Sequence, residues 1–181
     1  MNKQKILLSW SGLGREPFTF RSGRSEPGAH LQLLRDSEYA GVFDRHVLLA
    51  VPETLADCEG LVRELVSLPK PVQTEIKVLR LADPTDHVEI AYALARFFEK
   101  ADAGAGLLDH ELYVLLNAGT PQMQSVWITL HTQGLLDFRI IQTSPASLAQ
   151  RSGSPAAREV ELDLAGWATM FRKVTQRQSG D

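Results

Sequence analysis

Short apolar runs alternate along the chain with segments whose apolar residues recur at helical spacing. The runs predicted to be strands are Lys5–Trp10, His46–Val51, Glu75–Leu81, Leu112–Leu116 and Phe138–Thr143. Stretches such as Ile6-Leu7-Leu8 are continuously apolar, which is typical of strands covered on both faces of a parallel sheet.

Between these runs, the apolar residues follow the period of an amphipathic helix. The predicted stripes are Leu55, Cys58, Val62, Leu65 and Val66; Ile90, Leu94, Phe97 and Ala101; and Met123, Val126, Trp127 and Leu130. Asp86 and Thr120 precede two of them as candidate N-caps, and a shorter helix is predicted near Ala29–Arg35. The alternation predicts an α/β fold: a Rossmann-like, doubly wound, mainly parallel sheet of about five to six strands flanked by helices.

Two segments interrupt this alternation. Residues 11–28 are a long loop rich in Gly, Ser and Arg, directly after the first predicted strand. Residues 144–157 have the composition of a flexible linker. We therefore expect a Rossmann-like core over residues 1–143, a linker over 144–157, a C-terminal strand and helix over 158–177, and a disordered tail over 178–181.

Composition narrows the classes of function. A chain of 181 residues corresponds to about one domain. Its 19 basic and 22 acidic residues give a net charge of −3, which argues against binding long DNA or RNA along a basic surface but not against holding a few phosphates in a local pocket. The single Cys58 excludes an intrachain disulfide and fits a reducing compartment. No apolar run reaches the roughly 18 residues of a membrane span, and no signal-peptide pattern occurs, so we expect a cytoplasmic protein.

The loop after the fourth predicted strand carries the strongest chemical signal. Gly119 permits a tight turn, Thr120 suits a helix N-cap, and Pro121 suits the first helical position. The N-terminus of the helix that follows favours an anion. Asn117 and Gln122 add side chains that can bind a base, ribose or phosphate. A well-capped turn without any ligand fits the same residues equally well.

The loop after the first predicted strand, Ser9–Gly14, contains only G-x-G, so a nicotinamide dinucleotide is not expected. Three arginines, Arg15, Arg21 and Arg24, are either a lid over a phosphate or simply solvated. Trp10 either stacks on a base or packs in the core. The five histidines show no pair at metal-ligand spacing, and Walker A, G-x-S-x-G, H-E-x-x-H and C-x-x-C motifs do not occur, so neither a metal nor a cofactor is predicted.

Segment Tyr113–Pro145, a strand followed by a Gly-Thr-Pro-x-Met turn and a helix, resembles the second signature of CARF domains, the CRISPR-associated Rossmann fold. The opening KILLSWSGLG resembles the first signature of the same family. The Gln142–Pro145 stretch and the run at 158–162 resemble one branch of it. In that branch the domain precedes an ATPase in bacterial enhancer-dependent transcription activators, including regulators of RNA repair.

This resemblance implies a homodimer that binds a cyclic oligoadenylate, the signal made by type III CRISPR complexes in antiviral defence, in a cleft shared by two carboxyl-end surfaces. The residues that it assigns to ligand binding are Ser9, Trp10, Ser11, Gly12 and Leu13 on one side and Asn117, Gly119, Thr120, Pro121, Gln122 and Met123 on the other. A ligand-sensing regulatory domain is the leading hypothesis, with cyclic oligoadenylate or a related short RNA end as ligand. An interaction domain with a vestigial pocket is a weaker alternative.

The alternative within an enzyme class is a metal-independent ring nuclease that cleaves the same ligand. Some relatives do so, and the reaction needs the ribose 2′-OH in line with the phosphorus and a stabilised transition state. Ser11 and Thr120 are the candidate catalytic residues. No Lys occurs in segment 112–145, so charge stabilisation would fall to backbone N–H groups or to Arg24. Binding without cleavage is therefore preferred.

Overall fold

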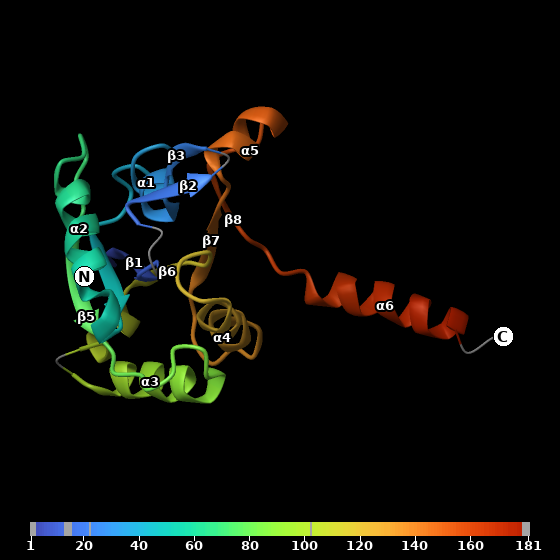
Figure 1. The fold of residues 1–181 in the computed structure, drawn as a ribbon. Helices are drawn as coiled ribbons and strands as arrows, with labels where there is room; N and C mark the ends of the chain where they lie inside the picture. The colour runs from blue at the N-terminus through green and yellow to red at the C-terminus, as the bar shows by residue number, and fades with distance from the viewer. Residues whose placement is uncertain (1–2, 13–15, 22, 102, 179–181) are drawn as a thin grey trace.

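The five predicted strands form the parallel part of a single six-stranded sheet with the order β5-β4-β1-β6-β7-β8 (Figure 1). The computed structural model describes residues 3–12, 16–21, 23–101 and 103–178. The sheet strands are β1 Lys5–Trp10, β4 Arg45–Ala50, β5 Gln73–Val78, β6 Glu111–Leu115, β7 Arg139–Thr143 and β8 Ala157–Glu159. Only β8 is antiparallel, and it pairs with β7 at one edge. The predicted fold class is confirmed.

Helices cover both faces of the sheet because successive side chains of a strand point to opposite faces. From β1, Ile6 and Leu8 pack into the core cluster under helices α3 and α4, whereas Leu7 packs into the cluster under α1 and α2. The helices are α1 Ala29–Leu34, α2 Leu55–Val66, α3 His87–Glu99, α4 Pro121–Thr132, α5 Ala146–Ser152 and α6 Leu164–Gln178, with 3-10 turns η1 at Pro52–Thr54 and η2 at Ala105–Asp109. None of the helices in the described part of the chain has the length and apolar character needed to span a bilayer.

The order of the strands reverses between β1 and β6. The chain proceeds from β1 to β4 and β5 on one side, then crosses back through α3 to β6 and β7 on the other. Strand β1 therefore pairs in parallel with both β4 and β6. In such a sheet the loops at the carboxyl ends of the two strands diverge at this point and leave a crevice, which is where ligands bind in doubly wound folds.

The loop over residues 11–28 contains structure that its composition did not predict. Strands β2 Phe18–Arg21 and β3 Arg24–Pro27 form an antiparallel hairpin, separate from the main sheet. Its base is closed by the Gly28 N–H, which donates to the Pro17 carbonyl at 2.8 Å. The hairpin stands above the carboxyl ends of the main strands, next to α1 and α5 (Figure 1).

The C-terminal segment also differs from the expectation. Helix α5 lies within residues 144–157, the stretch predicted to be a flexible linker, because Ala146-Ser147-Leu148-Ala149 favours a helix that Gly153 ends with a left-handed conformation at φ 64°. The strand and the helix predicted over 158–177 are β8, which ends at Glu159, and α6. Helix α6 begins at Leu164, where Asp163 accepts a hydrogen bond from the Gly166 N–H at 2.8 Å. Helix α6 projects away from the body (Figure 1).

Candidate functional site

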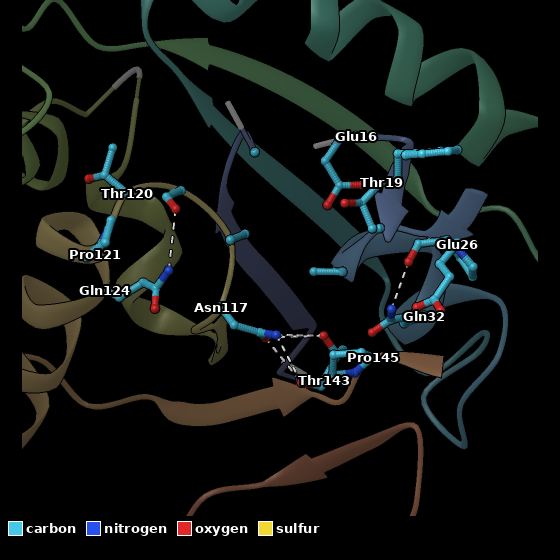
Figure 2. Close-up of a pocket in the computed structure, with 17 residues that line it drawn as sticks. Glu16, Thr19, Glu26, Gln32, Asn117, Thr120, Pro121, Gln124, Thr143 and Pro145 are labelled. Atoms are coloured by element: carbon cyan, nitrogen blue, oxygen red, sulfur yellow. Dashed lines mark hydrogen bonds between the residues drawn. The ribbon is translucent and has the colours of Figure 1, made fainter. Parts of the chain in front are cut away.

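A pocket of about 500 Å³ lies at the carboxyl ends of β1, β6 and β7, beside the point where the strand order reverses (Figure 2). Two stretches far apart in sequence supply its polar lining. One wall carries Gly12, Glu16, Thr19, Glu26 and Gln32; the other carries Asn117, Gly119, Thr120, Pro121, Gln124 and Thr143. The topology therefore brings together the two strand ends that the sequence predicts to be unusual.

The β6–α4 turn is built for close backbone approach. Gly119 has a φ of +84°, and a Cβ at this position would lie 2.7 Å from the Trp10 Cβ. The Thr120 Oγ1 accepts a hydrogen bond from the Met123 N–H at 3.1 Å and donates to the Pro84 carbonyl at 3.0 Å. Pro121 follows as the first residue of α4. The turn thus presents a well-capped helix N-terminus, whose dipole favours a negative group at the pocket.

Asn117 fastens this turn to the end of β7. Its Nδ2 donates to the Thr143 carbonyl and to Thr143 Oγ1, each at 2.9 Å, and its Oδ1 accepts from the Thr143 N–H at 3.0 Å. These contacts use both the donor and the acceptor of the amide. Asn117 therefore holds two neighbouring loops of the pocket in a fixed relation.

The opposite wall is acidic and is anchored from below. The Glu16 side chain is only 4% exposed, and its Oε1 lies 2.9 Å from His30 Nδ1. A Cβ at Gly12 would lie 2.8 Å from Glu16 Cγ, so this glycine makes room for the side chain. Glu26 faces Thr19 across the β2–β3 hairpin, and Gln32 Nε2 donates to the Pro27 carbonyl at 2.7 Å, which fixes the end of that hairpin.

Beneath this wall, a chain of polar side chains passes through the α1–α2 side of the sheet. Ser9 Oγ lies 2.8 Å from His30 Nε2 and 2.7 Å from His46 Nε2, and His46 Nδ1 lies 3.2 Å from Thr74 Oγ1. Because the serine hydroxyl has one proton, it donates to one imidazole and accepts from the other. Burial, and then the charge of His30, hold the pKa of His46 well below its usual value. His46 is therefore neutral in the folded protein.

The sequence-predicted site residues divide into those that line the pocket and those that support it. Gly12, Asn117, Gly119, Thr120 and Pro121 line it. Ser9 and Trp10 do not line it and are buried, because helices cover both faces of β1, and Ser11, the residue after β1, is buried as well. Gln122 is not part of the lining, and Met123 is buried in the core under α4.

Other predicted residues are placed as follows. Leu13 and Arg15 lie outside the described residues, as does the side chain of Arg21. Arg24 is exposed on β3 and does not line the pocket. The lid role of these arginines stays a prediction.

The candidate catalytic hydroxyls are both engaged in buried hydrogen bonds. Ser11 Oγ lies 2.7 Å from Thr54 Oγ1, and Thr120 Oγ1 caps α4 through the Met123 N–H and donates to the Pro84 carbonyl. Sequence reasoning missed Glu16, Thr19, Glu26, Gln32, Gln124 and Thr143 as lining residues. The run Gln142–Pro145 was the only stretch among them that carried a signal, since its resemblance to relatives was visible in the sequence.

A doubly wound sheet in this strand order, with its pocket between β1 and β6, defines a Rossmann-like domain with a crevice at the switch point of the sheet. The chain belongs to the family described as regulator of RNA terminal phosphate cyclase, whose family model matches residues 27–181. The expected resemblance to CARF domains and to regulators of RNA repair is confirmed.

Two solved structures were found to resemble this chain to different degrees. Csm6 from Enterococcus italicus, bound to cyclic hexa-2′-fluoro-hexa-dAMP, superimposes with a TM-score of 0.64 at 18% identity, over 98% of this chain and 46% of that one. Can2 from Sulfobacillus thermosulfidooxidans, in complex with cyclic tetra-adenylate, gives a TM-score of 0.45 at 10% identity, over 77% of this chain and 32% of that one. The chain thus spans less than half the length of either protein. No curated protein matches its sequence.

Proposed function

We propose that this domain is a sensor that binds a cyclic oligoadenylate, or a related short RNA end, in the pocket between β1 and β6. The observation that carries the proposal is the capped N-terminus of α4, which meets the pocket at Gly119, Thr120 and Pro121. Backbone and helix dipole favour a phosphate there without any basic side chain. A net charge of −3 is therefore compatible with a phosphate-bearing ligand.

The comparisons support the same class of ligand. The Csm6 structure with the similar fold was solved with a cyclic hexanucleotide, and the family is named for the regulation of an RNA terminal phosphate cyclase. Both point to a small nucleic-acid ligand with phosphate groups, in signalling linked to CRISPR or to RNA repair.

We further propose that the sensing unit is a homodimer. Large apolar side chains are exposed beside the pocket: Phe20 is 77% exposed and Phe18 44% exposed on the β2–β3 hairpin, and Leu148 on α5 is 48% exposed. Contact with the same face of a second copy would cover these side chains. It would also bring a second α4 N-terminus to a shared ligand, which suits a ring with one phosphate per nucleotide.

Titration calorimetry tests the proposal with cyclic tri-, tetra- and hexa-adenylate and with RNA ending in a 2′,3′-cyclic phosphate. We expect saturable binding of at least one of these ligands, with one ring bound per two chains if a ring is the ligand. Sedimentation of the free and bound protein reports the dimer. No binding of any of the ligands would overturn the proposal.

A charge-matched pair of variants locates the ligand. Gln124 lines the pocket near the start of α4 and donates to the Gly119 carbonyl at 3.4 Å, whereas Gln133 lies at the other end of the same helix. Gln124→Glu places a negative charge beside the proposed phosphate and should weaken binding about ten-fold or more. Gln133→Glu adds the same charge and should leave affinity within about two-fold of the wild type.

The alternative, a ring nuclease, requires an activated group near the ligand's 2′-OH. Ser11 and Thr120 were the candidates, and each hydroxyl is held in a buried hydrogen bond. No specific observation favours cleavage, so sensing is the function that we propose. Incubation of the bound ligand with the protein for hours, followed by chromatography, distinguishes the two: intact ligand indicates a sensor, and linear products indicate a nuclease.

A further inference from the structure

The pocket is chemically polarised. One of its walls contains the N-terminus of α4, which favours an anion, and the other wall contains two carboxylates, Glu16 and Glu26. No Lys, Arg or His occurs among the described residues that line it. A site that served phosphate groups alone would gain nothing from carboxylates, because they repel phosphate. Their presence therefore needs a different partner.

Glu16 carries an acceptor that the protein leaves unused. Its Oε1 lies 2.9 Å from His30 Nδ1 and accepts a hydrogen bond from the His30 backbone N–H at 3.4 Å, whereas its Oε2 is buried and has no hydrogen-bond partner within the described part of the chain. A buried carboxylate oxygen without a donor is costly, and a ligand N–H or O–H that reached it would relieve that cost. Figure 2 shows the Glu16 side chain extending from its loop toward the open centre of the pocket.

The position of Glu16 is fixed by the buried chain beneath it. His30 holds Oε1, and Ser9 holds His30 from the other ring nitrogen. Gly12 leaves space for the side chain from above. A carboxylate restrained on these sides loses little conformational entropy when it accepts a hydrogen bond, which is what an effective binding residue requires.

Glu26 adds a second acceptor from the hairpin. Its Oε2 accepts a weak hydrogen bond from Ser147 Oγ at 3.3 Å, and no ion pair with Lys or Arg is present for Glu26 in the described part of the molecule. It lies opposite Thr19 on the hairpin, and both side chains line the pocket (Figure 2).

We propose that Glu16 and Glu26 form an acceptor wall that binds the hydrogen-bond donors of the ligand's nucleoside part, while a phosphate faces α4. This inference rests on the proposed function and deepens it, because it names the residues that orient the ligand and select for donors. The donors on offer are ribose hydroxyls and the amino group of the base. A ligand that has phosphate but lacks the matching donor binds poorly, because its binding leaves the acceptors unsatisfied.

The variant Glu26→Gln separates this proposal from simple repulsion by the sign of its effect. The change preserves shape and removes the charge. If Glu26 accepts a hydrogen bond from the ligand, binding weakens about five- to ten-fold, the difference between a charged and a neutral acceptor. If Glu26 only repels the ligand's phosphates, binding becomes tighter. Glu99→Gln, with the same change of charge at the exposed end of α3, is the matched control and should leave affinity unchanged.

Two ligand analogues identify the donor. A ring with 2′-fluoro groups lacks the 2′-OH, and a cyclic oligo-inosinate lacks the adenine amino group. One analogue lacks the donor that hydrogen-bonds to the acceptor wall, and it should bind the wild type more weakly than the adenine ring does. The affinity of that analogue should no longer change in Glu26→Gln. Glu16→Gln, checked for folding by circular dichroism, should weaken the adenine ring in the same direction.

The calorimetric outcomes are distinct. Binding by the wild type that is weakened by Glu26→Gln and spared by Glu99→Gln supports the acceptor wall. Binding by the wild type that is unchanged or tightened in Glu26→Gln overturns the wall and leaves the proposed function standing. No binding of any ligand by the wild type overturns both.

Discussion

Replacing Gly119 with alanine would test how tightly the β6–α4 turn is packed against β1. The residue has a φ of +84°, and the added Cβ would lie 2.7 Å from Trp10 Cβ and 2.9 Å from Met123 Sδ. A non-glycine residue in this left-handed region costs about 1–2 kcal/mol. Trp10 is buried in the core and has no room to retreat, so overpacking adds about 1–3 kcal/mol. We expect Gly119→Ala to lower the free energy of unfolding by about 2–5 kcal/mol in total.

Gly134 offers a matched control just beyond the end of α4. Its φ is +63°, and nothing lies within 4 Å of an added Cβ. Gly134→Ala therefore carries the backbone cost alone, about 1–2 kcal/mol. The effect of alanine on the entropy of the unfolded chain is the same for both variants and cancels in their difference. The cost of the contact with Trp10 is therefore the difference between the losses of unfolding free energy in Gly119→Ala and Gly134→Ala. We expect this difference to be about 1–3 kcal/mol.

Urea denaturation followed by tryptophan fluorescence and circular dichroism measures both variants against the wild type. Equal slopes of free energy against urea for all proteins would show that the variants differ in stability and not in the extent of unfolding. If the two variants lose the same free energy to within about 0.5 kcal/mol, the close approach of Gly119 to Trp10 does not constrain the turn. That result would refute the reasoning.

Two further predictions concern stability. Thr120→Ala removes the acceptor for the Met123 N–H and the donor to Pro84 and should cost about 1–2 kcal/mol, while Thr120→Ser should cost much less, as measured by urea denaturation. His46 has a pKa held well below 6.5 in the folded state, so the unfolded chain takes up this proton first and stability falls as the pH drops below about 6.5. The loss should be seen between about pH 7.5 and about pH 5.5 in urea denaturation, and a His46→Asn variant should lack this part of the pH dependence.

The apolar pattern was sufficient to predict the strands that helices cover on both faces. The continuous run Lys5–Trp10 is β1 with the predicted bounds, because six consecutive residues with buried or half-buried side chains leave little choice of register. The β6–α4 turn was also readable, since Gly119, Thr120 and Pro121 each have a local conformational preference that serves the same turn.

The acidic wall of the pocket could not be predicted from local sequence patterns. The β2–β3 hairpin has four residues in each strand, too short for a convincing alternation, and its place above the sheet depends on contacts such as Gln32 with Pro27. Ser9 is polar and follows an apolar run, which is typical of a ligand-facing strand end. Its partners His30 and His46 come from other elements, so only the folded chain shows that Ser9 supports the site from below.

The antiparallel pairing of β8 with β7 gives the pocket a mechanical connection to α6. Thr143, which Asn117 holds at the pocket, is paired with Ala157, and the chain runs from there directly into α6. At 15 residues, the helix is about 22 Å long. A rotation of about 10° at its base would therefore move its far end by about 4 Å. A small rotation of β8 is in this way converted into a larger displacement at the far end of α6.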